Sequence, residues 1–135
     1  MQAPRIQVQG FTACFDGKPA VKNLDLEIFP HERLAIIGPA SSGKTTFLRS
    51  LNRLNDLDPG FTHSGEILRD GKNIYDADVD VAELRRKIGM VYAVPVPLPW
   101  SIYDNLVYGL RLAGVRDRTT LDERVETALG YAVLW

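Results

Sequence analysis

The sequence GPASSGKTT, residues 38–46, is the most informative stretch of this chain. Residues 38–45 have the pattern G-x-x-x-x-G-K-[ST]. The preceding LAII, residues 34–37, is a short apolar run with β-branched members, which predicts a buried strand. The segment that follows, up to residue 54, predicts a helix with these side chains on one face: Phe47, Leu48, Leu51 and Leu54. A glycine-rich loop between a strand and a helix predicts a phosphate-binding loop, and the alternative is an ordinary glycine turn.

Each residue type in this loop has a chemical use. Backbone N–H groups between the glycines can surround a phosphate, and the first turn of the helix adds unpaired N–H groups and a positive dipole end. Lys44 would place its charge near the β- and γ-phosphates of a nucleotide, and the Thr45 hydroxyl would ligate Mg²⁺. The predicted cofactor-binding residues are Gly38, Pro39, Ala40, Ser41, Ser42, Gly43, Lys44, Thr45 and Thr46, with Thr45 also the metal ligand.

The composition is that of an ordinary globular chain. The 135 residues are 45% hydrophobic and 24% charged, with a net charge of −1 and a sequence pI of about 6.1. We therefore expect one domain or part of one, with no basic excess for nucleic acid or a lipid surface. Cys14 is the only cysteine, which favours a reducing, cytoplasmic compartment. No apolar run reaches the ~20 residues of a membrane span, and no signal peptide is recognisable.

Before the loop, the sequence predicts two antiparallel strands. Residues 5–11 and 21–29 alternate between apolar and polar side chains, and Asp16-Gly17 between them is a turn signal. Phe15 lies at this turn. It is interpreted either as an ordinary core or surface aromatic, or as a flat ring on which a nucleotide base can stack.

After the loop, the sequence predicts a short hairpin, a helix and another strand. Residues 56–64 are predicted to be a loop, and residues 66–69 and 72–74 to pair across an Asp70-Gly71 turn. Asp80 with Glu83 predicts the start of a helix over residues 81–87, followed by a strand over 88–92. The cationic run at residues 85–87 is interpreted as a solvated helix face rather than a phosphate or nucleic-acid patch.

The last third of the chain begins with VPVPLPW, residues 94–100. Its three prolines exclude a helix or an inner strand, so we expect an exposed, stiff loop with an apolar tip at Leu98 and Trp100. This tip would dock a partner, or else Trp100 would fold back into the core.

Two helices are predicted beyond this loop. Ser101 with Asp104 would cap a helix through Ala113 that buries Ile102, Leu106 and Leu110. Thr120 with Glu123 would cap a second helix, whose apolar face holds Leu121, Val125, Ala128, Leu129 and Ala132.

Three stretches carry a resemblance to a known family. They are IGPASSGKTTFLRSLNRLNDL (residues 37–57), GKNIYDADVDVAELRRKIGMV (71–91) and PVPLPWSIYDNLVYGLR (95–111). They resemble the ATP-binding subunit of an ABC transporter, specifically of the phosphate-import type, and the resemblance covers about residues 5 to 135. It implies an α/β P-loop NTPase core over about 33–93, an antiparallel β subdomain over about 1–32, and the start of a helical subdomain over 94–135.

The resemblance also implies roles for single residues. Phe15 matches the aromatic that stacks on adenine, with phenylalanine where tyrosine is usual. Ala93 falls where the family has a glutamine that contacts Mg²⁺ and the attacking water. Residues 94–104 would face the membrane permease, and Leu98, Trp100, Ile102 and Tyr103 would form the docking cluster. The implied protein is a homodimer, cytoplasmic and peripheral at the inner face of the membrane, without nucleic acid or direct insertion into the bilayer.

The implied activity is ATP hydrolysis, with ATP and Mg²⁺ as cofactors, coupled to phosphate import. The family's Walker B carboxylates, signature loop and switch histidine have no counterpart in this sequence, so we expect an incomplete domain, no catalytic residue within it, and no turnover by the chain alone. Two alternatives stay open. One is a non-catalytic ABC fragment that binds nucleotide or permease. The other is a small P-loop kinase or NTPase, for which neither an Arg-rich lid nor an acceptor carboxylate is recognisable.

Overall fold

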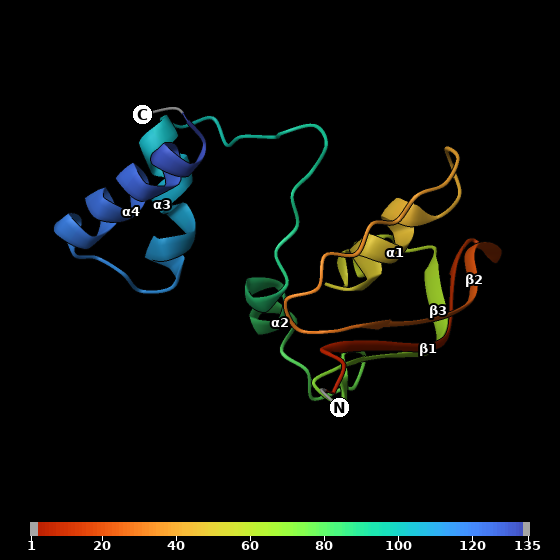
Figure 1. The fold of residues 1–135 in the computed structure, drawn as a ribbon. Coiled ribbons are helices and arrows are strands. Elements are labelled where there is room, and N and C mark those ends of the chain that lie inside the picture. The colour runs from red at the N-terminus through yellow and green to blue at the C-terminus, as the bar shows by residue number, and fades with distance from the viewer. Residues whose placement is uncertain (1–2, 134–135) are drawn as a thin grey trace. The chain divides into compact units, whose positions relative to one another are not determined.

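The computed structural model describes residues 3–133, which form two compact units divided between Met90 and Val91 (Figure 1). The first unit is built on a four-stranded antiparallel sheet with the strand order β2-β1-β3-β4. Two of its strands precede the glycine-rich loop and two follow it. The sheet therefore includes residues from both sides of residue 33, the predicted boundary between the β subdomain and the core. The boundaries of the three predicted subdomains stay predictions.

The first two strands form the predicted hairpin. β1 spans Ile6–Phe15 and β2 spans Lys18–Ile28, and their register runs from Ile6 opposite Ile28 to Phe15 opposite Lys18. Asp16 and Gly17 connect them, and both have positive φ (48° and 74°). Such paired positive φ values suit a two-residue hairpin turn, because they match the twist of the strands.

The third strand is longer than the sequence predicted. β3 spans Phe61–Arg69 and pairs with β1 along most of its length, from Ile6 opposite Arg69 to Phe15 opposite Phe61. Residues 61–64 are therefore strand, and the predicted loop over 56–64 is wrong for them. These residues form a strand because β1 supplies their hydrogen-bonding partners. The local sequence of residues 61–64 does not indicate this pairing. The short helix η1 (Leu54–Leu57) precedes β3, and β4 (Lys72–Asn73) follows across the predicted Asp70-Gly71 turn.

One helix covers the core of this unit. α1 spans Lys44–Ser50, shorter than predicted, and Phe47 and Leu51 are buried with the sheet side chains Val8, Phe11, Ala13 and Ile67. Leu48, predicted on the same face, is exposed. Helix α2 (Val81–Lys87) has the predicted bounds, and the Asp80 side chain accepts hydrogen bonds from the N–H groups of Ala82 and Glu83.

The strands predicted over residues 34–37 and 88–92 are not formed. Residues 34–37 and 88–92 have no strand structure, and Ile37 and Val91 are 91% and 97% exposed. A strand is stable only when neighbouring strands supply its hydrogen bonds, and no segment of residues 3–133 pairs with either run. Their apolar sequences alone led to the wrong prediction.

The second unit is a pair of helices. α3 spans Ile102–Leu112 and α4 spans Arg118–Tyr131, and their shared core consists of Val107, Leu121 and Val125. Leu121, Val125 and Leu129 lie on the predicted face of α4, but Ile102 and Leu106, predicted to be buried, are exposed. Val107 and Tyr103 take their place, because they face α4. The predicted Ser101 cap of α3 is present, whereas Asp117, not Thr120, caps α4.

The proline-containing segment before α3 has no helix or strand and is exposed from residue 94 to residue 100, as predicted. Trp100 is 52% exposed and contacts Tyr108 of α3 edge to face, with ring centroids 5.3 Å apart. Among residues 3–133, no helix has the length and apolar character needed to cross a bilayer.

Candidate functional site: the phosphate-binding loop

The loop between residues 38 and 46 is held against strand β2 by a close backbone contact. Gly43 has φ +89°, and a Cβ atom there would lie 2.3 Å from the carbonyl oxygen of Ala20. Only glycine fits this combination of positive φ and close approach. Helix α1 begins at the next residue, with the Phe47 N–H donating to the Gly43 carbonyl at 2.8 Å.

Lys44 turns back over the loop. Its Nζ donates to the carbonyl oxygens of Gly38 at 2.8 Å and Pro39 at 2.6 Å, and to Ser42 Oγ at 3.2 Å. The ammonium group therefore lies inside the curve of the loop rather than in open solvent. Because the ammonium is a compact charge with three donors, it can exchange these neutral acceptors for phosphate oxygens.

A hollow of about 150 Å³ opens beside this charge. It is lined by Ala20 of β2 and by residues 41–46, which include Lys44 and Thr45. Residues 44–46 of the lining form the first turn of α1, where backbone N–H groups lack partners within the helix, and phosphate oxygens prefer such an environment. Gly38, Pro39 and Ala40 are outside the lining, although Gly38 and Pro39 hold Lys44.

Thr45 is the predicted Mg²⁺ ligand at this site. Within residues 3–133, no three His, Cys, Asp or Glu side chains gather in a way that could hold a metal. Thr45, one of the residues that line the hollow, carries a single hydroxyl oxygen. Mg²⁺ commonly takes only one or two protein ligands and completes its octahedron with phosphate oxygens and water, so the residues present fit a nucleotide-borne ion.

Phe15 lies on the same side of the sheet hairpin as the loop contact. Val21, whose side chain is also near Gly43, pairs with Ala13 of β1, and Phe15 follows two residues later. At ~3.4 Å per residue, Phe15 is about 7 Å farther along the strand than this contact. Its side chain is half-buried and contacts Phe61, with ring centroids 5.5 Å apart.

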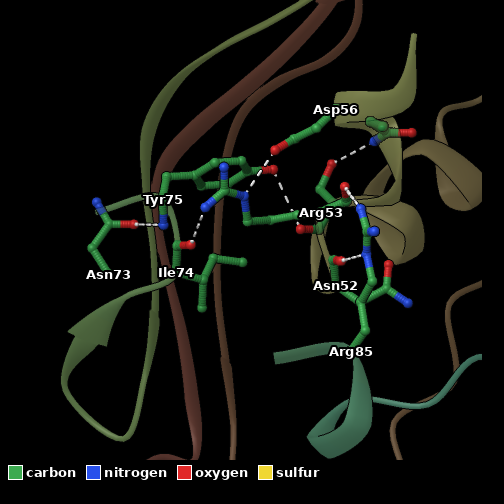
Figure 2. Close-up of polar contacts among 9 residues, drawn as sticks. Asn52, Arg53, Asp56, Asn73, Ile74, Tyr75 and Arg85 are labelled. Atoms are coloured by element: carbon green, nitrogen blue, oxygen red, sulfur yellow. Dashed lines mark hydrogen bonds and ion pairs between the residues drawn. The ribbon is translucent and has the colours of Figure 1, made fainter. Parts of the chain in front are cut away.

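The far end of α1 is fixed by a polar network that the sequence did not reveal (Figure 2). Arg85 of α2 donates to the carbonyl oxygens of Asn52 at 3.2 Å and Arg53 at 2.8 Å, and is half-buried rather than part of a solvated face. The Tyr75 hydroxyl donates to the Ser50 carbonyl at 3.3 Å. Burial, reinforced by the Asp56 carboxylate, raises the pKa of Tyr75, so this donor stays protonated.

Arg53 completes the network. It has a positive φ of 58°, which turns the chain out of the helix, and its guanidinium binds Asp56 at 2.8 Å and the Ile74 carbonyl at 3.2 Å. The same group lies 5.2 Å from the centre of the Tyr75 ring. The carbonyl groups of Ser50, Asn52 and Arg53, at and just after the end of α1, thus receive side-chain donors from two distant residues, Tyr75 and Arg85.

The loop residues and Phe15 belong to the first unit, whereas Ala93 is an exposed residue of the second unit without regular structure. The sequence did not predict the contacts of Arg85 with Asn52 and Arg53, because their acceptors are backbone carbonyls, which every residue has.

Comparison with known proteins gives consistent results. Residues 21–133 match the ABC transporter family. The whole chain is 46% identical to the phosphate import ATP-binding protein PstB 1 of Streptococcus pyogenes serotype M3, of which it covers 54%, and 44% identical to that of Streptococcus agalactiae serotype III, again covering 54%. The chain therefore spans about half the length of these curated relatives.

A solved structure is similar as well. The structure of a bacterial Atm1-family ABC exporter with ATP bound superposes with a TM-score of 0.67 and 29% identity, over 85% of this chain and 18% of the exporter chain. The glycine-rich loop, the mixed α/β unit with its antiparallel sheet, and the match over most of the sequence agree. This chain belongs to the ABC transporter family.

Proposed function

We propose that this protein binds ATP together with Mg²⁺ and serves as the ATP-binding subunit of an ABC importer for inorganic phosphate. The observation that carries the proposal is Lys44, whose ammonium group is held by the Gly38 and Pro39 carbonyl oxygens of the glycine-rich loop, at the start of α1. The names of the relatives, phosphate import ATP-binding proteins, support the choice of nucleotide and of transported ion.

In this proposal, residues 38–46 bind the phosphates. The loop amides and Lys44 balance the negative charge of the β- and γ-phosphates, while Thr45 supplies a hydroxyl oxygen to Mg²⁺. Phe15 offers an exposed part of its ring to the adenine base. Dimerisation and a peripheral place on the cytoplasmic side of the membrane belong to the same proposal. ATP hydrolysis belongs to it as well, but no residue of this chain is assigned a catalytic role.

We assign the permease-facing surface to the apolar tip, which comprises Leu98, Trp100, Ile102 and Tyr108. All four side chains are exposed by more than a third, and apolar clusters of this kind occur at interface cores. Tyr103, included in the sequence-based cluster, does not belong to it, because it packs against the helix-pair core and its hydroxyl donates to Asp122 at 2.5 Å.

The test is calorimetric titration with MgATP. Lys44→Ala should weaken nucleotide affinity by at least tenfold, because a charge-assisted contact to phosphate is worth about 1.5–3 kcal/mol. Lys72→Ala is the matched control, since it removes the same charge from an ion pair with Asp78 at 2.6 Å that does not line the hollow. Equal affinities of the wild type and Lys44→Ala would refute the proposed site.

A further inference from the structure

Phe61 contacts the ring that is proposed to bind adenine. It is the first residue of β3 and is paired across the sheet with Phe15, the last residue of β1. Their ring centroids are 5.5 Å apart and their planes are inclined by 50°. Tilted aromatic pairs at this separation are favourable beyond the area they bury.

Phe61 is itself held firmly on its other sides. Its N–H donates to the Asp58 carbonyl at 3.0 Å, and the neighbouring Gly60 carbonyl accepts from the Asp16 N–H at 2.9 Å, which ties the start of β3 to the β1–β2 turn. Its ring also stacks with His63 at a centroid distance of 5.9 Å, and His63 stacks on Tyr75 at 3.7 Å. Phe61 is therefore part of a row of rings that leads back to the core.

Phe15 has no comparable polar anchor. A phenylalanine ring carries no hydroxyl, so its orientation depends on packing alone. It stands at the end of its strand, next to the two-residue turn, and Phe61 is the aromatic neighbour that the structure gives it. The aromatic contact of Phe15 is thus with a residue 46 positions later in the chain.

We infer that Phe61 is a positioning residue for nucleotide recognition, holding the Phe15 ring at the angle in which its open face stacks on the base. This inference rests on the proposed nucleotide site and adds to it the residue that determines base affinity. Phe61 would act only through Phe15. Its loss should therefore weaken ligands that carry a base and spare ligands that consist of phosphates alone.

The experiment compares two ligands, MgATP and inorganic triphosphate with Mg²⁺, by calorimetric titration of the full chain. The variants are Phe61→Leu, which keeps apolar volume without a ring, Phe61→Ala, Phe15→Ala, and the double variant Phe15→Ala/Phe61→Leu. Ile6→Ala is the matched control, because Ile6 packs against the same core at the opposite end of β1. Thermal melts establish that each variant is folded at the titration temperature.

We expect both Phe61 variants to raise the dissociation constant for ATP by about two- to tenfold, the worth of an aromatic pair, and to leave that for triphosphate within twofold. The double variant should bind ATP no more weakly than Phe15→Ala, because the two residues act as one unit. Ile6→Ala should change neither constant.

Three results would overturn the inference. Equal weakening of ATP and triphosphate would show a general distortion of the site, and a further loss in the double variant would show that Phe61 acts independently of Phe15. If Phe15→Ala leaves the ratio of the dissociation constants for ATP and triphosphate unchanged, Phe15 does not stack on the base, although the phosphate-binding loop can still bind phosphates. A wild-type chain that binds neither ligand would instead refute the proposed function, and the inference with it.

Discussion

Gly43 is the residue on which the shape of the phosphate-binding loop most depends. Its φ of +89° lies in the region that side chains rarely adopt, and a Cβ atom would also lie 3.0 Å from a methyl group of Val21 and 2.3 Å from the Ala20 carbonyl oxygen. The last contact is with backbone, so it cannot be relieved by a side-chain rotation. Any larger residue would have to push the loop away from β2.

Substitution by alanine separates the cost of the positive φ from the cost of the contact with Ala20. Gly43→Ala should weaken nucleotide binding strongly and destabilise the first unit. Gly17→Ala, at φ +74° with nothing within 4 Å of the added methyl, should cost only the ~1–2 kcal/mol of the backbone conformation. Denaturant unfolding and titration with MgATP measure both quantities. Equal effects of the two variants on affinity would show that the contact with Ala20 is unimportant.

The charge state of His63 depends on its surroundings in the folded chain. Its ring lies against that of Tyr75 at 3.7 Å, and desolvation lowers the pKa of His63, with Arg53 acting in the same direction and Asp56 against it. The unfolded chain therefore binds a proton at higher pH than the folded chain does. Stability must then rise with pH through the window that ends at the ordinary pKa of about 6.5.

We expect the free energy of unfolding to decrease as the pH falls from 7.5 to 5.5, and to do so less in His63→Phe, which keeps the ring but does not titrate. The effect should be small, because His63 remains partly exposed. Carboxylates with lowered pKa values, such as Asp104 and Asp117, lose their contribution only near and below pH 4, outside this window. Identical pH dependences of wild type and His63→Phe would contradict the assignment.

At the scale of single elements, the carboxyl end of α1 shows how a short helix is held in place. α1 has only seven residues, too few to be stable by itself, and its exit segment is fixed by Arg85, Arg53 and Tyr75 (Figure 2). The phosphate-binding loop leads directly into this helix. Anchoring the far end of α1 therefore also limits how far the loop can move.

Replacing Arg85 by methionine tests this anchor. Arg85→Met keeps the apolar stem and removes the donors to the Asn52 and Arg53 carbonyls, so we expect a loss of about 1–3 kcal/mol in unfolding free energy. Arg86→Met, at the exposed neighbouring position of the same helix, should change stability by less than about 0.5 kcal/mol. Chemical denaturation followed by circular dichroism distinguishes them, and equal stabilities would show that the network contributes nothing.

The same scale explains which elements could be predicted from the sequence. The Asp16-Gly17 and Asp70-Gly71 turns and the Asp80 cap of α2 depend on local chemistry, and all three are present. The phosphate-binding residues also have a local signature, so the candidate loop could be identified in advance, and its role stays a prediction. Strand formation at 34–37 and 88–92 depends on distant partners, and there the prediction is wrong.

The same reasoning applies to the pairs that build the site. The contact of Phe15 with Phe61 depends on the register between β1 and β3, which a pattern of apolar residues does not set. The Arg85 contacts end on backbone carbonyls, which every residue has. Both kinds of contact become visible only once the chain is folded.

At the scale of the whole molecule, each of the two units has its own hydrophobic core. The first unit contains the phosphate-binding loop, Phe15 and the sheet core, whereas the second has its own small core of Val107, Leu121 and Val125. In the second unit, Asn105 fixes the proline segment: its side chain accepts from the Leu98 N–H at 2.8 Å and donates to the Leu98 and Trp100 carbonyls at 3.1 and 3.2 Å. The apolar tip is thereby presented on an ordered backbone.

This division predicts that the tip can be altered without affecting the nucleotide site. Trp100→Ala should weaken binding to the permease subunits of a phosphate importer by about tenfold or more, because interface tryptophans commonly contribute 2 kcal/mol or more. Affinity for MgATP should be unchanged. Tyr131→Ala is the matched control, since Tyr131 is an 86% exposed aromatic of the same unit that lies outside the tip. Binding is measured with purified permease in detergent, and stability by thermal melting of each variant. If Trp100→Ala lowers the melting temperature while permease binding per folded molecule is unchanged, Trp100 serves the fold of the helix pair, and the assignment of the apolar tip to a membrane partner is wrong.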